Sequence, residues 1–275
     1  MNTLSEPIER ACYLCGGNIF DIVMAGNYSF FLLDSKPVPF RAIRCRRCDF
    51  VMTDPPPSAS YEDNSFVEDS DRLISSAHYR LRRLRPYLNS RTRILDIGCS
   101  TGYSLEEAAR YGVQESVGVE LCMASAEAGR RMGRDIRSIP LQECKFGDGQ
   151  FDVVQAHHTL EHIPALRECL TEISHITKPG GIFYVTQPRY NSPIVRDSNW
   201  CGWFPQEHYW HFSEKTLIRL MAEYGFELVT YNCPLHSEYG TAKNWMYVPK
   251  RAYKTLVKVF RLGDMVDAIF VKRLT

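Results

Sequence analysis

Residues 94–105, Ile-Leu-Asp-Ile-Gly-Cys-Ser-Thr-Gly-Tyr-Ser-Leu, decide the fold class of this 275-residue chain. An apolar run ends in a turn that holds Gly98 and Gly102, and residues 104–109 have the composition of a helix. Such a turn lets a ligand approach the backbone closely, and the first amides of the helix can bind its polar or anionic end. The glycine patterns of dinucleotide and triphosphate sites are missing at this turn. The stretch therefore predicts a nucleotide-type site for a ligand other than NAD or ATP, with an ordinary strand-to-helix turn as the alternative.

Residues 95–102 closely resemble motif I of the class I S-adenosylmethionine (SAM) dependent methyltransferases, usually Leu-Asp-hydrophobic-Gly-Cys-Gly-Thr-Gly. Ser100 stands where the family has its middle glycine. The resemblance implies a Rossmann-like sheet of seven strands, with the last strand antiparallel, and SAM as cofactor. It places SAM on the residues of this turn, which are Asp96, Gly98, Cys99, Ser100 and Gly102.

An acidic residue follows at the spacing that a nucleoside site requires. Residues 116–120 form a short apolar run that ends in Glu120, about twenty residues after the glycine turn. A carboxylate there can accept both ribose hydroxyls of an adenosine, so Glu120, with Leu121 beside it, is the predicted ribose site. The alternative is a solvated glutamate at a strand end. Adenine recognition is expected from backbone groups around Leu141 or from the side chain of Gln142.

From residue 91 onward, predicted strands and helices alternate, which specifies a doubly wound, mainly parallel α/β sheet. Lys178-Pro179-Gly180-Gly181 is expected to end a helix and turn into the fifth strand, because proline cannot continue a helix and glycine accepts a left-handed turn. The expected strands are 93–97, 116–120, 135–139, 151–156 and 182–186, with 226–231 and 267–274 as a final antiparallel pair. One helix is expected to begin near residue 104, and three more are expected at 124–132, 165–176 and 213–224. Ser213 is expected to cap the last of them.

Four of the ten cysteines form two Cys-x-x-Cys pairs near the N-terminus. Two such turns can supply a tetrahedral four-thiolate site, so Cys12, Cys15, Cys45 and Cys48 are predicted to bind a structural zinc ion. A redox dithiol is the alternative. The chain between the pairs is expected to form a hairpin. The predicted domains are a zinc-ribbon-like module at 1–55, a linker and helix at 56–90, and a methyltransferase domain at 91–275.

Residues 75–88 are predicted to form a helix rich in arginine. The arginines could contact RNA, but a solvated surface that covers apolar groups is the favoured interpretation. Because the family packs the helix before motif I near its cofactor, Tyr79 is a candidate to close over SAM.

The fourth strand delivers His157-His158-Thr159-Leu160-Glu161-His162 to the ligand edge of the sheet. The segment resembles the Leu-Glu-His segment of the subgroup that includes the ubiquinone-pathway O-methyltransferases. In some of those relatives an acid-x-x-Glu-His pattern holds a divalent cation, which makes His158, Glu161 and His162 an alternative metal site. Histidine suits the removal of a hydroxyl proton at neutral pH. His157 and His158 are therefore the predicted general bases, and His157 also borders SAM.

A second polar cluster, expected to form a substrate lid at 187–212, contains Glu207-His208-Tyr209-Trp210-His211-Phe212. A similar Glu-His-x-x-His-Phe segment recurs in the same subgroup. His208 is the predicted acceptor-side catalytic residue. Trp203 and Tyr209 are weaker candidates for substrate contact, because clustered tryptophans can also form core.

Composition limits the class of partner. The formal net charge is +1, and no apolar run reaches the length of a membrane span or of an export signal. We therefore expect a cytoplasmic enzyme that meets neither a membrane nor nucleic acid. The expected activity is O-methylation of a small-molecule or carrier-linked glycan or secondary-metabolite intermediate. The alternatives are an RNA methyltransferase that uses the zinc module and the arginine helix, and a catalytically silent SAM-binding protein.

Overall fold

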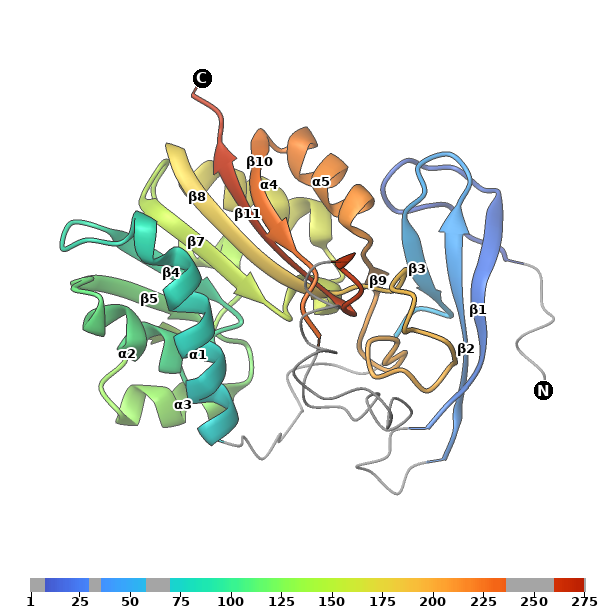
Figure 1. Ribbon diagram of the computed structural model, residues 1–275, viewed down its shortest axis with the longest axis horizontal. Helices are drawn as coiled ribbons and strands as arrows, with labels where there is room; N and C mark the ends of the chain where they lie inside the picture. Colours follow the sequence, from blue (N-terminus) through green and yellow to red (C-terminus); the bar gives the residue numbers. More distant parts are fainter. Residues whose placement is uncertain (1–7, 30–35, 58–69, 236–259, 275) are drawn as a thin grey trace.

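The computed structural model describes residues 8–29, 36–57, 70–235 and 260–274. Two β-sheets lie side by side, a large one flanked by helices and a smaller one near the N-terminus (Figure 1). Residues 58–69 of the predicted linker lie outside the described residues. Among the described residues, no helix is both long and apolar enough to cross a bilayer.

The large sheet has seven strands in the order β10-β11-β8-β7-β4-β5-β6. Neighbouring strands from β8 to β6 are parallel, whereas β11 runs antiparallel to both β8 and β10. This confirms the predicted α/β sheet with its antiparallel strand. The strands are β4 (Arg93–Ile97), β5 (Glu115–Val119), β6 (Ile136–Arg137), β7 (Phe151–His157), β8 (Thr177–Pro188), β10 (Phe226–Asn232) and β11 (Met265–Lys272).

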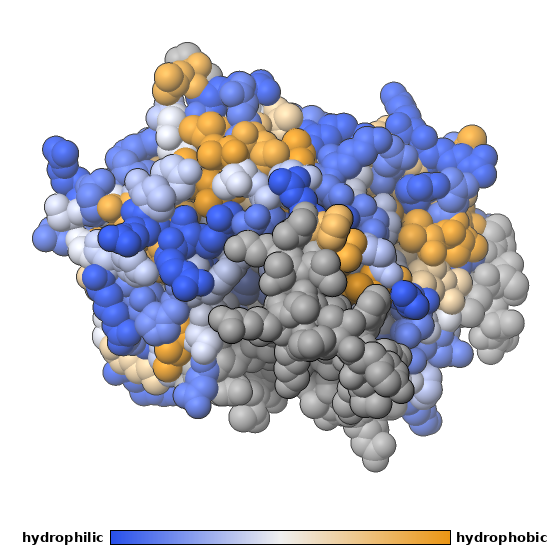
Figure 2. All heavy atoms as spheres, in the orientation of Figure 1, coloured by the Kyte–Doolittle hydropathy of each residue, from blue (hydrophilic) through white to orange (hydrophobic). Residues whose placement is uncertain are grey.

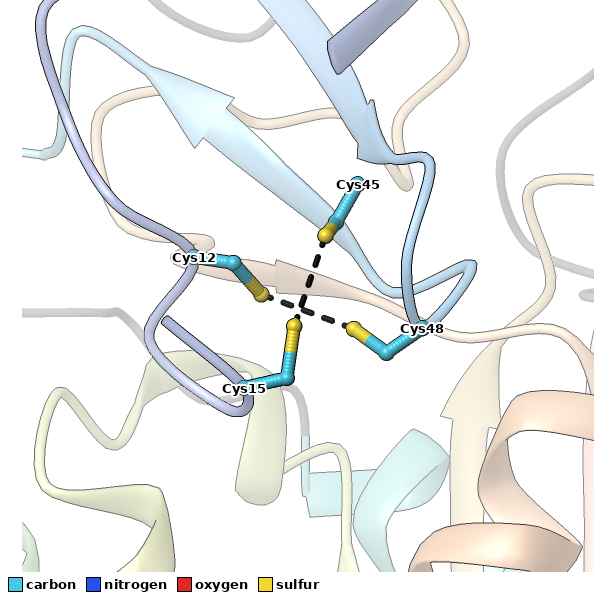
Figure 3. Close-up of side chains that lie close together, drawn as sticks. All are labelled: Cys12, Cys15, Cys45 and Cys48. Atoms are coloured by element: carbon cyan, nitrogen blue, oxygen red, sulfur yellow. Dashed lines mark hydrogen bonds between the residues drawn. The ribbon is translucent and has the colours of Figure 1, made fainter. Parts of the chain in front are cut away.

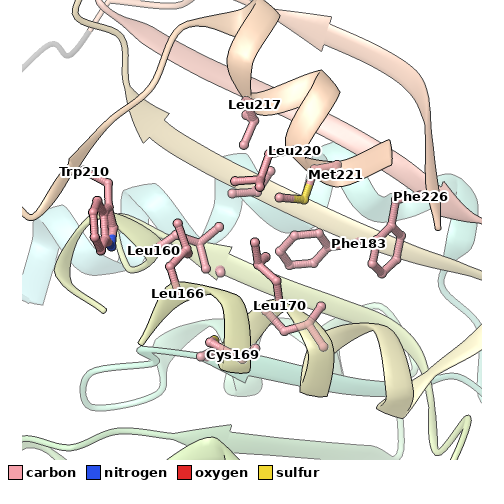
Figure 4. Close-up of a cluster of buried hydrophobic side chains, with 14 of the residues drawn as sticks. Leu160, Leu166, Cys169, Leu170, Phe183, Trp210, Leu217, Leu220, Met221 and Phe226 are labelled. Atoms are coloured by element: carbon pink, nitrogen blue, oxygen red, sulfur yellow. The ribbon is translucent and has the colours of Figure 1, made fainter. Parts of the chain in front are cut away.

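Helices cover both faces of this sheet because successive strand residues point to opposite sides. Ile94 and Val153 pack with Leu81 of α1 on one face, whereas Leu95 and Val154 belong to the cluster on the other face. Figure 4 shows that second cluster, with leucines of α4 and α5 around Phe183. Each fully buried leucine or phenylalanine stabilises the fold by roughly 1.5–3 kcal/mol. The helices are α1 (Ser70–Leu84), α2 (Tyr103–Arg110), α3 (Met123–Arg131), α4 (Leu166–Ile176) and α5 (Glu214–Glu223).

Two predicted elements, one helix and one strand, differ from the structure by four or five residues at an end. Helix α1 begins at Ser70 and ends at Leu84, and a 3-10 turn (Arg85–Tyr87) follows because Pro86 cannot continue the α-helix. Strand β8 starts directly after α4 and includes Gly180, which has a φ of 76°. Ser213 caps α5 as predicted, with its side chain accepting a hydrogen bond from the amide of Thr216.

Two arginines of the helix face inward, whereas Arg82 and Arg85 are exposed. Arg80 lies 3.5 Å from the buried Asp96, and Arg83 lies 3.2 Å from the buried Asp267. The hydroxyl of Tyr79 donates to the same Asp267 at 2.7 Å, and Tyr79 is not among the described residues that line the cavity presented below. The outer surface over α1 to α3 is mainly hydrophilic, on the left of Figure 2.

The small sheet has the order β1-β2-β3-β9 and joins distant parts of the chain. Its first two strands form the predicted hairpin between the cysteine pairs. Its fourth strand comes from the predicted lid. The strands are β1 (Phe20–Tyr28), β2 (Val38–Cys45), β3 (Val51–Asp54) and β9 (Trp210–His211). The N-terminal region therefore shares a sheet with the segment that follows β8.

Candidate functional site

A cavity of about 490 Å³ opens beyond the carboxyl ends of the parallel strands, where ligands bind in open α/β sheets. The turns after β4 and β5 line one side through Gly98 and Glu120. The segments after β7 and within the lid line the other side through His158, Glu207 and Tyr209. The cavity therefore has a nucleoside-like half and a histidine-rich half.

The glycine turn after β4 packs closely against Thr159. Gly98 has a φ of 69°, and a Cβ there would lie 2.3 Å from the hydroxyl of Thr159. Ser100 also adopts a left-handed conformation, with a φ of 54°, although it carries a side chain. Gly102 precedes the first turn of α2 with a φ of 82°. The turn thus keeps a glycine-like path despite the serine.

Glu120 is buried at the end of β5 and faces the cavity. One carboxylate oxygen accepts the amide of Ser100 at 2.8 Å, and the other accepts the amide of Cys122 at 2.8 Å. Each oxygen of a carboxylate can accept more than one hydrogen bond, including one from a hydroxyl. The arrangement suits the paired hydroxyls of a ribose.

The structure divides the predicted cofactor residues into two groups. One group lines the cavity and comprises Gly98, Glu120, Leu121, Leu141 and Gln142. The other group lies behind the turn. Asp96 is fully buried and accepts from Ser104 and Arg80, while Cys99 donates to the carbonyl of Ser100 at 3.5 Å.

Asp96 therefore braces the turn rather than bordering the cavity. Burial raises the pKa of its carboxyl, and the nearby Arg80 opposes that rise. Ser100 and Gly102 shape the turn through their backbone and are also absent from the cavity lining that the described residues form.

The two histidines at the end of β7 point to different places. Nε2 of His157 lies 3.2 Å from the hydroxyl of Ser76 on α1, and His157 is not among the described residues that line the cavity. His158 lines the cavity, with 27% of its side chain exposed. It has a φ of 51°, a conformation that is uncommon for a residue with a side chain and that concentrates at functional sites.

A buried carboxyl stands behind His158. Oε1 of Glu161 lies 3.3 Å from Nδ1 of His158, and the Glu161 side chain is 1% exposed. Burial raises the pKa of Glu161 to about 7, although the neighbouring His208 opposes that rise. His158 and Glu161 thus form a dyad at the wall of the cavity.

His208 lies next to this dyad but is buried rather than open to the cavity. Its Nδ1 donates to the carbonyl of Gly202 at 2.9 Å, which leaves Nε2 as the lone-pair nitrogen of the neutral ring. Burial lowers the pKa of His208 and, more strongly, that of His162. Both imidazoles are therefore neutral at physiological pH.

The three residues that the structure brings together as possible metal ligands differ from the predicted set of His158, Glu161 and His162. Glu161, His162 and His208 each place one donor atom within 4.8 Å of the others, so His208 replaces the predicted His158 in that set. Nδ1 of His162 also lies 3.5 Å from a carboxylate oxygen of Glu207. The histidine-rich half is thus a compact network of imidazoles and carboxyls.

The lid tryptophans form core rather than a substrate wall. Trp203 is 1% exposed and packs against Phe40 and Trp200 at ring distances of 6.0 and 5.4 Å. Tyr209, by contrast, lines the cavity. Thr159 also lines it and was missed from the sequence, where a threonine beside two histidines carries no distinctive signal.

The four predicted zinc ligands converge at the edge of the small sheet (Figure 3). Sγ of Cys12 lies 3.5 Å from Sγ of Cys48, and Sγ of Cys15 lies 3.5 Å from Sγ of Cys45. A disulfide requires about 2.05 Å, whereas a zinc tetrahedron with bonds of about 2.3 Å places its sulfurs about 3.8 Å apart. The spacing fits a four-thiolate metal site and does not fit disulfides.

Comparison with known proteins identifies the large sheet and its helices. A family model described as a methyltransferase domain matches residues 68–231. The chain belongs to this methyltransferase family. The matched range contains the glycine turn, Glu120, the His158–Glu161 dyad and the lid, whereas the four cysteines lie before it.

Curated relatives of the methyltransferase domain differ in the atom that they methylate. The chain is 33% identical over 105 residues to a ubiquinone biosynthesis O-methyltransferase of Bordetella bronchiseptica, covering 35% of this chain and 43% of the relative. It is 34% identical over 106 residues to a sterol 4-C-methyltransferase of Caenorhabditis elegans, covering 36% and 31%. The chain thus spans less than half the length of these relatives.

Solved structures share the fold of the domain. A SAM-dependent methyltransferase from Archaeoglobus fulgidus aligns with a TM-score of 0.56 at 21% identity, covering 72% of this chain and 94% of that one. One from Mesorhizobium loti aligns with a TM-score of 0.54 at 16% identity, covering 73% and 100%. The domain therefore shares its fold with these SAM-dependent methyltransferases.

Proposed function

We propose that this protein transfers the methyl group of SAM to a hydroxyl of a small-molecule or carrier-linked glycan or secondary-metabolite intermediate. The observation that carries the proposal is one cavity that joins a ribose-type carboxylate, Glu120, to a histidine–glutamate dyad, His158 and Glu161. The first half fits the nucleoside of SAM. The second half fits an acceptor that must lose a proton.

SAM is proposed to bind across the turns after β4, β5 and β6. Glu120 accepts the ribose hydroxyls, and Leu141 and Gln142 border the adenine. Gly98 lines the cavity, and the neighbouring Thr159 excludes a side chain at this position. SAM held by these residues would supply a methyl group to the histidine-rich half, and the alignment of methyl and nucleophile would contribute much of the rate.

The reacting part of the acceptor is proposed to be neutral or cationic. Two carboxylates, Glu120 and Glu207, line the cavity, and no lysine or arginine lines it within the described part of the chain. A phosphate at the reaction centre would therefore meet negative charge without a cationic partner. Hydroxyls of a sugar or a phenol meet no such repulsion.

His158 is proposed to act as the general base. An ionised Glu161, 3.3 Å from Nδ1 of His158, would favour a proton on Nδ1 and leave Nε2 to take the proton of the acceptor hydroxyl. Bound SAM would supply the methyl group and leave as S-adenosylhomocysteine. A positioned base of this kind accelerates such a step by about 10²–10⁴-fold. His208 is buried beside Glu161, so its proposed role is to influence Glu161 and not to contact the acceptor.

The four cysteines are proposed to bind one structural zinc ion. All four thiols face one another, and Gly16 and Asp49, which follow the two pairs, adopt the left-handed conformations expected of such turns, with φ values of 71° and 59°. Zinc bound there would link the two Cys-x-x-Cys turns. It would have no open coordination position for catalysis, since all four ligands come from the protein.

The proposed acceptor chemistry is tested by incubating the protein with isotopically labelled SAM and three acceptor pools: neutral glycans and phenols, phosphorylated metabolites, and RNA. We expect label in the first pool. Arg80 and Arg83 are held by buried carboxylates, which argues against their gripping RNA. Label in RNA would overturn the proposal. Binding of S-adenosylhomocysteine with no transfer to any pool would favour the silent SAM-binding protein.

A further inference from the structure

The lid and the N-terminal region share one small sheet. Strand β9 pairs antiparallel with β3, with Val51 opposite His211 and Met52 opposite Trp210. Strand β3 lies outside residues 68–231, the range that the methyltransferase family model matches. A strand from outside the family domain is thus joined directly to the lid.

Thr53 of β3 makes the contacts that reach the acceptor half. Its side chain is buried, and its hydroxyl donates to the carbonyl of His208 at 2.5 Å. The same hydroxyl lies 2.8 Å from Nε2 of His211. Because its proton is used on His208, the hydroxyl accepts from Nε2–H of His211. One side chain therefore fixes two lid residues.

The backbone of Tyr209 continues this connection to the dyad. Its carbonyl accepts the amide of Thr53 at 3.0 Å, and its own amide donates to the carbonyl of Glu161 at 2.8 Å. Tyr209 lines the cavity. The chain of bonds therefore runs from Thr53 through Tyr209 to Glu161, which stands behind His158.

The first Cys-x-x-Cys turn also contacts residues at the acceptor half of the cavity. Tyr13 packs on Trp210 with ring centroids 4.8 Å apart, and its hydroxyl donates to Glu168 at 2.7 Å. Nε1 of Trp210 in turn donates to the carbonyl of Ile163 at 2.7 Å. Ile163 lines the cavity.

The cofactor half is held differently. Gly98 donates its amide to Val119, Glu120 accepts from Ser100, and Thr159 donates to Ile97. These bonds all lie within the family domain. The N-terminal contacts therefore converge on the acceptor half of the cavity.

We propose that the N-terminal four-cysteine region is a working part of the acceptor site, and that Thr53 is a positioning residue for His208, Tyr209 and Glu161. The region sets how the acceptor wall is held and leaves the SAM half unchanged. The part that concerns the acceptor rests on the proposed methyl transfer.

The test compares Thr53→Val, which removes the hydroxyl and keeps the shape, with Thr53→Ser, which restores the hydroxyl. Thr177→Val is a matched control, because Thr177 is also buried and its hydroxyl donates to the carbonyl of Ile173 at the start of β8, in the large sheet. Hydrogen exchange of the backbone and calorimetric binding of S-adenosylhomocysteine are measured for each variant. Neither measurement requires a known acceptor.

We expect amides of residues 208–212 to exchange about tenfold faster in Thr53→Val, the size of effect expected from losing a buried hydrogen bond. Thr53→Ser and Thr177→Val should keep the protection of those amides, and the affinity for S-adenosylhomocysteine should change less than twofold in all three. Tyr13→Ala, a milder change on a partly exposed residue, should also loosen residues 208–212 and serves if Thr53→Val does not fold.

Unchanged hydrogen exchange at residues 208–212 in both Thr53→Val and Tyr13→Ala would overturn the proposal. A tenfold loss of affinity for S-adenosylhomocysteine in Thr53→Val, as large as the effect on exchange, would also overturn it. With any acceptor found by the labelling experiment, kcat or acceptor KM should change while the KM for SAM stays constant. If the wild-type protein binds no S-adenosylhomocysteine, the proposed function fails, but the exchange comparison still decides whether Thr53 holds the lid.

Discussion

Nδ1 of His158 lies 3.3 Å from Oε1 of Glu161, and the pair spans the boundary between cavity and core. The His158 side chain is 27% exposed, whereas that of Glu161 is 1% exposed. The imidazole can therefore meet an acceptor, while the carboxyl can only act through the imidazole.

Removing the imidazole should slow transfer without weakening the cofactor. We expect His158→Gln to lower kcat by about 10²–10⁴-fold, because the acceptor hydroxyl loses its base. The affinity for S-adenosylhomocysteine should change little. His175→Gln, an exposed histidine on α4, is the control and should behave as wild type. Full turnover in His158→Gln would show that alignment alone suffices or that the nucleophile is not a hydroxyl.

The dyad also predicts a pH dependence. His158 is a stronger base through Nε2 when Glu161 is ionised, because a nearby carboxylate stabilises a proton on Nδ1. Because burial raises the pKa of Glu161 to about 7, kcat should rise as the pH rises through about 7. In Glu161→Gln this rise should disappear and the rate should remain low. A rate that is flat with pH in the wild-type protein would argue against the dyad.

Glu120 should supply affinity for the nucleoside. Removing its charge in Glu120→Gln should weaken S-adenosylhomocysteine binding by about 1–3 kcal/mol, the range for a charge-assisted hydrogen bond to a hydroxyl. Glu115→Gln, at the exposed start of the same strand, should leave binding unchanged. Calorimetry measures both. Equal affinities for the two variants would remove Glu120 from the ribose site.

The cysteine cluster should hold one zinc ion per chain. Cys45→Ser should lose the metal, because a hydroxyl is a poor substitute for a thiolate ligand, and should loosen residues 8–57. Affinity for S-adenosylhomocysteine should be largely kept. Cys201→Ser, in the lid, should keep the metal. Elemental analysis of the purified proteins decides the matter, and wild-type protein without zinc would refute the assignment.

Acid should destabilise the fold through its buried histidines. Burial lowers the pKa values of His162, His208 and His211, so these rings take up protons more readily in the unfolded chain than in the folded one. Their stabilising contribution is complete above about pH 6.5 and is lost as the pH falls below that value. Glu161 acts in the opposite direction, because its raised pKa makes the folded state favour the proton between about pH 4.5 and 7.

The pKa is lowered for three histidines and raised for one carboxyl, so we expect the loss of stability from the histidines to exceed the gain from Glu161. The urea concentration at the unfolding midpoint should therefore decrease as the pH is lowered from 6.5 to 5.5. Each proton that distinguishes the two states contributes up to about 1.4 kcal/mol per pH unit. His211→Gln should flatten this dependence. A midpoint that is constant over that range would contradict the prediction.

The sequence by itself determined the α/β sheet, the glycine turn with Glu120 and the two cysteine pairs. These features depend on residues close together in the chain. Apolar periodicity sets the strands, Gly98 permits a backbone path that a side chain would block, and each Cys-x-x-Cys fits within one turn.

The tertiary structure alone decided which polar groups meet. Sequence spacing placed His157 and His158 together, but strand alternation and the packing of α1 sent one to Ser76 and left the other in the cavity. The pairing of Tyr79 with Asp267 and of Thr53 with His208 joins residues 188 and 155 positions apart. Contacts at such separations depend on how the two sheets pack against each other. A local sequence pattern does not predict that packing.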